Sequence, residues 1–204
     1  MEDELDAWAE GGRAVDLWWR DDDAQGPTPA LQRLLALSTG AAMPLTLAVV
    51  PMGAENALVD MLETAPRVTV VQHGYAHVNL AGAHGKKAEL AAGRPASEAL
   101  AELIRGRRRL ARLFGGRFRA VLTPPWNRID PALVPALPGA GIRGLSAFGA
   151  RQSAEPAAGL TQGNCHVDIL DWRGTRGFVG EDAALAAIVD HLAQRRRGEV
   201  DAEE

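Results

Sequence analysis

The stretch AVDLWWRDDDAQG, residues 14–26, places an apolar run directly before three consecutive aspartates. The run AVDLWW (14–19) predicts a buried strand, and Asp21, Asp22 and Asp23 follow where that strand leaves the core. Adjacent carboxylates repel one another, so such a group is commonly a helix cap together with solvated charge. The alternative is that at least one of the three aspartates holds a metal ion.

The same order, an apolar run followed by an amphipathic segment, repeats along the chain. The predicted strands are 14–19, 44–50, 67–73, 118–123, 142–148 and 165–170, and the main predicted helices are 28–38, 55–65, 97–114 and 181–197. Thr28 and Ser97 are the predicted N-caps of the first and third helices. Alternating strands and helices predict an α/β fold, as a (β/α) barrel or an open parallel sheet. Reactive groups then gather at the carboxyl ends of the strands.

Composition restricts the class of protein. A chain of 204 residues with 47% hydrophobic residues suits one domain, with an ordered core at about 14–197 between two acidic ends. A net charge of -4 gives no basic field for nucleic acid or an anionic membrane. A single cysteine excludes an internal disulfide, and no signal-peptide pattern or membrane-length apolar run is present. We therefore expect a cytoplasmic protein.

Polar and aromatic side chains follow most of the predicted strands. QHGYAHVN follows the third strand, TPPWNR the fourth, and DILDW ends the sixth. His73 and His77 together with one aspartate would form a two-histidine, one-carboxylate site, which suits zinc and other divalent first-row ions. The histidine pair alone is weak support for a metal site, but its position near the aspartates along one sheet edge favours one.

These motifs, in this order, resemble the polysaccharide deacetylases, the NodB-homology enzymes of carbohydrate esterase family four. The resemblance spans about residues 14–197 and rests on Asp-Asp, His-x-x-x-His, Pro-Pro-Trp and Asp-x-x-Asp-Trp motifs; WWRDDDA marks a divergent branch. It implies a distorted (β/α) barrel and a zinc-dependent hydrolase that removes acetyl groups from N-acetylated sugars or related small acetamides.

The resemblance also assigns roles. It implies that Asp21 is the catalytic base and that Asp22, His73 and His77 bind the metal; Asp23 stands where the family has glycine, so the Asp21/Asp22 pair could be Asp22/Asp23 instead. The residues matched to the substrate groove and to the motif that tunes the base are Pro124, Pro125, Trp126, Asp168, Asp171 and Trp172. The backbone N–H of Tyr75 is a candidate oxyanion donor.

Two departures from the family pattern affect the predicted chemistry. Thr123 replaces the arginine that precedes the prolines, so Arg128, Arg20 or Arg173 would have to orient the base, with Arg128 taken as the main candidate. A final strand with a Leu-x-x-His type motif, whose histidine protonates the leaving amine, has no counterpart before the acidic end. The barrel is therefore expected to lack its last strand, and the exposed sheet edge could pair with another chain.

Two other functions remain open from the sequence. Without the acid-bearing strand, the chain could be a catalytically weak or inactive protein that binds a metal or carbohydrate. A phosphate-handling protein that uses magnesium is disfavoured, because no Gly-rich loop follows any predicted strand.

Overall fold

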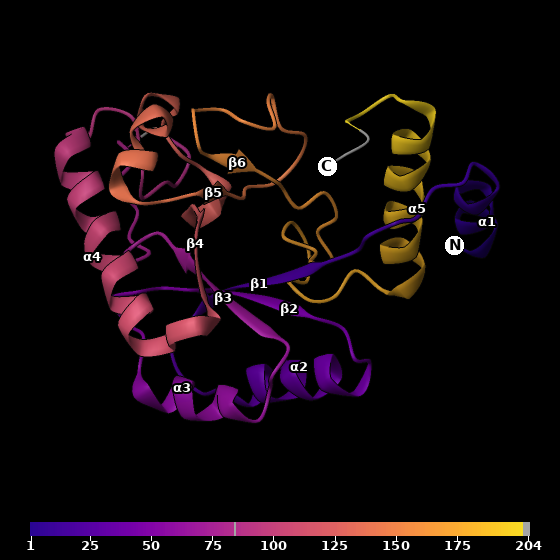
Figure 1. Cartoon of the computed structure of the whole chain (residues 1–204), viewed down its shortest axis with the longest axis horizontal. Helices are drawn as coiled ribbons and strands as arrows, with labels where there is room; N and C mark the ends of the chain where they lie inside the picture. Colours follow the sequence, from indigo (N-terminus) through magenta and orange to yellow (C-terminus); the bar gives the residue numbers. More distant parts are fainter. Residues whose placement is uncertain (84, 202–204) are drawn as a thin grey trace. The chain divides into compact units, whose positions relative to one another are not determined.

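Six parallel strands form the centre of the computed structural model, which describes residues 1–83 and 85–201. The strands are β1 Trp19–Ala24, β2 Leu45–Val49, β3 Val68–His73, β4 Phe118–Thr123, β5 Gly144–Leu145 and β6 Thr161–Gln162. Each pairs with its sequence neighbour, in the order β1-β2-β3-β4-β5-β6 (Figure 1). Within the described residues the sheet is not closed, so the predicted parallel α/β fold is confirmed as an open, barrel-like sheet.

The described residues form two compact units. The first, here called the sheet unit, comprises residues 18–147 and 153–163 and contains every strand. Its helices are α2 Pro29–Gly40, α3 Asn56–Glu63 and α4 Ala96–Phe114, with short 3-10 turns at Gly115–Arg117, Pro125–Asn127, Pro131–Ala136 and Pro138–Ala140.

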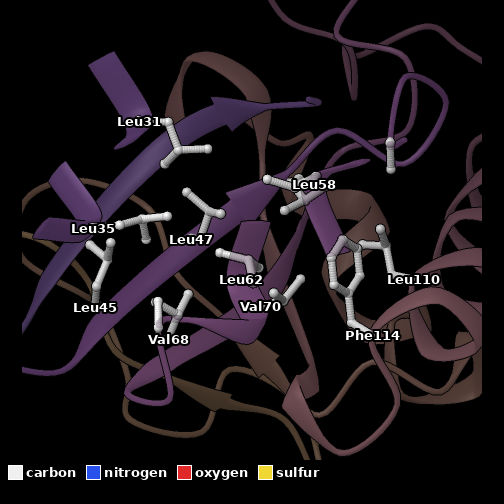
Figure 2. Close-up of a cluster of buried hydrophobic side chains, with 13 residues drawn as sticks. Leu31, Leu35, Leu45, Leu47, Leu58, Leu62, Val68, Val70, Leu110 and Phe114 are labelled. Carbon is white, nitrogen blue, oxygen red and sulfur yellow. The ribbon is translucent and has the colours of Figure 1, made fainter. Parts of the chain in front are cut away.

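A leucine-rich core joins the three helices to one face of the sheet. Leu31 and Leu35 of α2, Leu58 and Leu62 of α3, and Leu110 and Phe114 of α4 pack against alternate residues of the strands (Figure 2). On β2 and β3 these alternate residues are Leu45, Leu47, Val49, Val68 and Val70. Because side chains alternate along a strand, residues between them face the opposite side. This alternation places Trp19 and Asp21 of β1 on one side of the sheet and Arg20 on the other.

The second unit, here called the terminal unit, comprises residues 1–17, 148–152 and the described chain from 164 onward. It contains helices α1 Glu2–Glu10 and α5 Glu181–Arg197. Arg196 donates to both carboxylate oxygens of Glu4, at 2.7 and 2.9 Å, and so links the two helices. None of the helices in the described chain combines the length and the apolar composition that a membrane span requires.

Several predicted boundaries are wrong. The first strand is shifted from 14–19 to Trp19–Ala24, so the aspartates lie within it rather than after it. The strand predicted at 142–148 shrinks to two residues, and 165–170 forms only isolated bridges. The unpredicted β6 takes the edge position at Thr161–Gln162, and α1 is a further unpredicted element. Thr28 caps α2 as predicted, by accepting from the Leu31 N–H, but Ser97 lies inside α4 and does not cap it.

Candidate metal centre

Three side chains converge at the carboxyl ends of β1 and β3. Asp23 Oδ1 lies 3.0 Å from Nε2 of His73 and 3.0 Å from Nε2 of His77. One potential ligand atom from each residue lies within 4.8 Å of the other two. The His73 ring is buried and the Asp23 side chain is 62% exposed, so the cluster is anchored in the sheet and open on one side.

A backbone irregularity brings Asp23 to the histidines. The pairing register of β1 with β2 shifts between Asp21 and Ala24, and Asp23 has a positive φ of 74°. Such a bulge re-aims the side chain that follows it, and aspartate tolerates positive φ better than most residues. The bulge therefore turns the Asp23 carboxylate toward the two imidazoles.

The hydrogen bond on the far side of the His73 ring sets which nitrogen faces Asp23. Nδ1 lies 3.0 Å from the carbonyl oxygen of Thr123, which can only accept, so Nδ1 carries the proton. Nε2 then faces Asp23 either as a second N–H or as a lone pair that needs a cation between the two atoms. The hydrogen bond with His73 is also what lowers the pKa of Asp23 most. A carbonyl behind a ligating imidazole is the usual support in metal sites, and these three side chains fit a divalent ion.

Asp22, the predicted metal ligand, does not join the histidines. Its oxygens accept from Arg20 Nε at 2.8 Å and Arg20 Nη2 at 3.0 Å. The Arg20 side chain is only 5% exposed and also donates to Ser146 Oγ and Asn127 Oδ1. The structure thus moves the carboxylate of the cluster from Asp22 to Asp23, the one-residue alternative that the sequence left open.

Asp21, the predicted base, points to the helix-covered side of the sheet. It pairs in register with Leu47, a core residue, and shares its face with Trp19, which packs on the same core. Burial, followed by the charges of Asp22 and Asp23, raises the pKa of Asp21 to about 6. The Arg20-bound Asp22 lies on the opposite face, so the two carboxylates have separate environments.

The Pro-Pro-Trp segment lies beside His77. Trp126 has its ring centroid 4.4 Å from that of His77, and Trp126 and Asn127 both have φ of 56°, an uncommon value for residues with a Cβ. Pro125 is buried against Gly74, where an added Cβ would lie 2.6 Å from Pro125 Cγ. The segment therefore forms one wall of the candidate site.

Two other predicted roles are not supported by the contacts. The N–H of Tyr75 donates to Glu89 Oε1 at 3.0 Å, so it is not free for an oxyanion. Arg128 is exposed and donates to the Lys87 carbonyl at 2.9 Å rather than to an aspartate. Glu89, which is buried beneath the histidine loop, was not predicted, because a lone glutamate in the polar segment GKKAEL carries no signal of a role.

The Asp-x-x-Asp-Trp motif belongs to the terminal unit, where it organises its own loop. Asp171 accepts from the N–H groups of Gly174 and Thr175, both at 2.9 Å, and these bonds hold its pKa below the ordinary value. Asp168 accepts from Trp172 Nε1 at 2.6 Å. The predicted roles of Asp171 and Trp172 at the site remain predictions.

No family model and no curated protein matches this sequence. Solved structures do match the fold. A Mycobacterium smegmatis protein assigned as a polysaccharide deacetylase has a TM-score of 0.61 and 18% identity, and the match covers 85% of this chain and 61% of that one. A Streptococcus mutans CE4 esterase has a TM-score of 0.56 and 13% identity, with coverage of 87% and 67%. The peptidoglycan N-acetylglucosamine deacetylase Bc1960 has a TM-score of 0.55 and 15% identity, with coverage of 95% and 90%.

Proposed function

From the polysaccharide deacetylase (CE4) fold that this chain adopts, we propose a metal-dependent hydrolase that removes acetyl groups from N-acetylated sugars or related small acetamides. The observation that carries this proposal is the convergence of Asp23, His73 and His77 within that fold. The resemblance in the four sequence motifs supports the same function independently of the coordinates.

Zinc suits the proposed ligand set of two imidazole nitrogens and one carboxylate oxygen. Bound there, the ion would make a water molecule more acidic and polarise the acyl carbonyl. Three protein ligands leave room for water and substrate on the exposed side, where Asp23 and His77 reach solvent. His73 supplies rigidity, because its ring is buried and bonded to the Thr123 carbonyl.

Asp22 is the proposed general base, in place of Asp21. It is the carboxylate next to Asp23 on the chain, its side chain is 28% exposed, and Arg20 orients it through two parallel hydrogen bonds. In this role it accepts the proton of the attacking water. Arg20 replaces the arginine that the family carries where this chain has Thr123. Asp21 is excluded from this role in the proposal, because it faces the helices.

The wall formed by Pro125 and Trp126 is the proposed substrate contact. The Trp126 ring lies against His77 and is partly exposed, so one of its faces or edges is available to a sugar ring. Aromatic rings in this position combine large apolar area with little loss of side-chain freedom on binding. Tyr75, whose ring lies 5.1 Å from the Arg105 guanidinium, flanks the same loop.

A second candidate is metal or carbohydrate binding without turnover. One observation favours it: the Asp171 carboxylate, which the resemblance links to tuning of the base, accepts hydrogen bonds from its own loop. In that case the metal cluster would remain functional as a binding site, and hydrolysis would be slow or absent.

Acetate release from chitooligosaccharides separates the two candidates. We expect release by the zinc- or cobalt-loaded protein, and loss of most of it after chelation, in the His73→Ala/His77→Ala double variant and in Asp22→Asn. Asp60→Asn, on the exposed side of α3, is the matched control and should match the wild type. Metal binding without acetate release would favour the second candidate, and release that survives chelation would contradict the first.

A further inference from the structure

Glu89 is a fully buried carboxylate that has no cationic partner among residues 1–83 and 85–201. Its exposed fraction is 0%, and within the described residues it forms no ion pair with lysine, arginine or histidine. A buried carboxylate is costly unless hydrogen bonds replace its water. Three backbone N–H groups do so here, from Tyr75 at 3.0 Å, Ala76 at 2.9 Å and His77 at 3.1 Å. The side chain thus binds three consecutive amides of the loop that carries a metal-site histidine.

The backbone of this loop is shaped around the Glu89 carboxylate. Consecutive N–H groups that turn toward one acceptor form a nest, a conformation that binds anions. Gly74 has φ of 55°, and a Cβ on it would collide with Glu89 Oε2 and lie 2.6 Å from Pro125 Cγ. His77 itself has φ of 55°, which a residue with a Cβ adopts only when its surroundings hold it there. The Glu89 carboxylate supplies three of the contacts that hold this loop.

The segment of Glu89 is also tied to the Pro-Pro-Trp wall. Leu90 forms a parallel bridge with Ile129, and the Asp130 N–H donates to the Leu90 carbonyl at 2.8 Å. Trp126, from the same wall, contacts the His77 ring. Glu89 therefore belongs to a segment that contacts both the histidine loop and the chain that follows the Pro-Pro-Trp wall.

We propose that Glu89 is a positioning residue for the metal centre. By binding the amides of 75–77 it holds the His77 Nε2 atom where it converges with Asp23 and His73, and so it sets the affinity of the site for a divalent ion. Glu89 does not touch the ion or the substrate. This inference rests on the metal site of the proposed function and adds a residue that the sequence motifs do not contain.

The chemistry of the side chain makes the proposal specific to a carboxylate. A carboxylate has two acceptor oxygens and can accept all three N–H groups. The amide of glutamine has one acceptor oxygen, and its NH₂ group would face a backbone N–H. Glu89→Gln keeps the size of the side chain but leaves at least one buried donor unsatisfied. Glu89→Asp keeps the carboxylate on a shorter stem and should restore part of the binding.

The test measures Zn²⁺ and Co²⁺ affinity of the purified full chain by titration calorimetry. Loss of such a supporting contact typically weakens metal binding about 10- to 100-fold, so we expect that loss in Glu89→Gln and a smaller one in Glu89→Asp. The control is Glu102→Gln. Glu102 belongs to the same unit, but its carboxylate pairs with Arg94 and does not accept from the amides of residues 75–77. Wild-type affinity in a folded Glu89→Gln protein would overturn the inference.

Hydrogen exchange of the amides of residues 75–77 gives a second readout that needs no metal. We expect these amides to be protected in the metal-free wild type and to exchange at least ten times faster in Glu89→Gln or Glu89→Asp, with helix α2 unchanged. Equal exchange in the wild type and both variants would also overturn the inference. A wild-type chain that binds neither ion, yet shows the protected amides, would refute the proposed metal site instead.

Discussion

Arg20 is the residue on which the orientation of the proposed base depends. It is almost fully buried and fixes both oxygens of Asp22, while Ser146 and Asn127 hold the rest of its guanidinium. Together with a bond to the Ala147 carbonyl, these are five hydrogen bonds to three segments of the chain, and they leave the guanidinium one orientation. The sequence offered three arginines for this task and favoured Arg128, because nothing in the local pattern shows which of them points inward.

Arg20→Lys should impair catalysis while keeping the positive charge. A lysine ammonium cannot form the two parallel hydrogen bonds of the guanidinium, so the Asp22 carboxylate loses its fixed orientation. Displacement of a catalytic group by about 1 Å typically costs roughly 100-fold in rate, and we expect a loss of about that size in kcat with metal affinity within about twofold of wild type. Steady-state kinetics and zinc titration measure both. Arg143→Lys, an exposed arginine of the same unit, is the control; an unchanged kcat in Arg20→Lys would refute the role.

Asp21 should make the metal-free protein less stable as the pH rises. Its pKa is raised from 3.8 to about 6 in the folded state, so between these values the folded chain holds a proton that the unfolded chain has lost. Stability from this group is present below pH 3.8 and is lost as the pH rises through about 6, by at most about 3 kcal/mol. Asp21→Asn, which cannot ionise, should therefore be more stable than wild type at pH 7 and about equal at pH 4.

Urea unfolding of the chelator-treated protein from pH 4 to pH 7 measures this difference. Asp60→Asn should follow the wild-type curve, because Asp60 is exposed. If the stability of the wild type instead rose from pH 4 to pH 7 relative to that of Asp21→Asn, the folded state would not disfavour the ionised form of Asp21, and the prediction would be wrong.

At the scale of single residues, the sequence predicts the two histidines of the cluster and leaves its carboxylate open between Asp22 and Asp23. His73 and His77 follow from spacing and strand position, both of which are local properties. The change from Asp22 to Asp23 depends on a bulge in β1 and a positive φ at Asp23, which tertiary contacts decide. The same holds for Glu89, whose partners lie 12 to 14 residues away along the chain.

Helix α4 lies against β3 at Gly106, and this contact helps to hold the start of the histidine loop. A Cβ at Gly106 would lie 2.6 Å from Gln72 Nε2 and 2.8 Å from Pro51 Cγ. Gln72 is fully buried and donates from Nε2 to the carbonyls of Gly74 and Leu103. The glycine thus allows the helix close enough for Gln72 to bridge it to the start of the histidine loop.

Gly106→Ala should destabilise the chain even though alanine is the better helix former. Relief of the close contact requires Gln72 or Pro51 to shift, at a typical cost of about 1–3 kcal/mol, which at least cancels and over most of its range exceeds the gain of about 1 kcal/mol in helix propensity. Gly40→Ala is the control, because a Cβ at Gly40 of α2 meets nothing within 4 Å and should be neutral or stabilising. Urea midpoints of the two variants give the comparison, and a stabilised Gly106→Ala would refute the close packing.

At the scale of elements, long periodic segments are predictable and short edge strands are not. The predicted strand 118–123 and the predicted helix 181–197 match the observed bounds, since each pattern is continuous and has clear breakers. β5 and β6 have two residues each, too few for any periodicity to indicate. Apolar runs such as CHVDIL resemble strands, but 165–170 finds only isolated bridge partners.

At the scale of the whole molecule, alternation of strands and helices was sufficient to predict the parallel sheet. The parallel pairing of the strands follows from this alternation, whatever their detailed bounds, and the structure adds their sequential order. The local backbone geometry, which includes the bulge in β1 and the nest around Glu89, could not be predicted from this pattern. A single domain, a cytoplasmic location and pairing through an open sheet edge stay predictions.

The most direct test of the metal centre is the zinc-edge anomalous difference map of a crystal of the zinc-loaded protein. We predict one strong peak about 2.0–2.2 Å from a carboxylate oxygen of Asp23 and from Nε2 of both His73 and His77, with Asp22 still held by Arg20. A map without a peak among these three side chains, or with zinc bound by Asp22 in place of Asp23, would contradict the account.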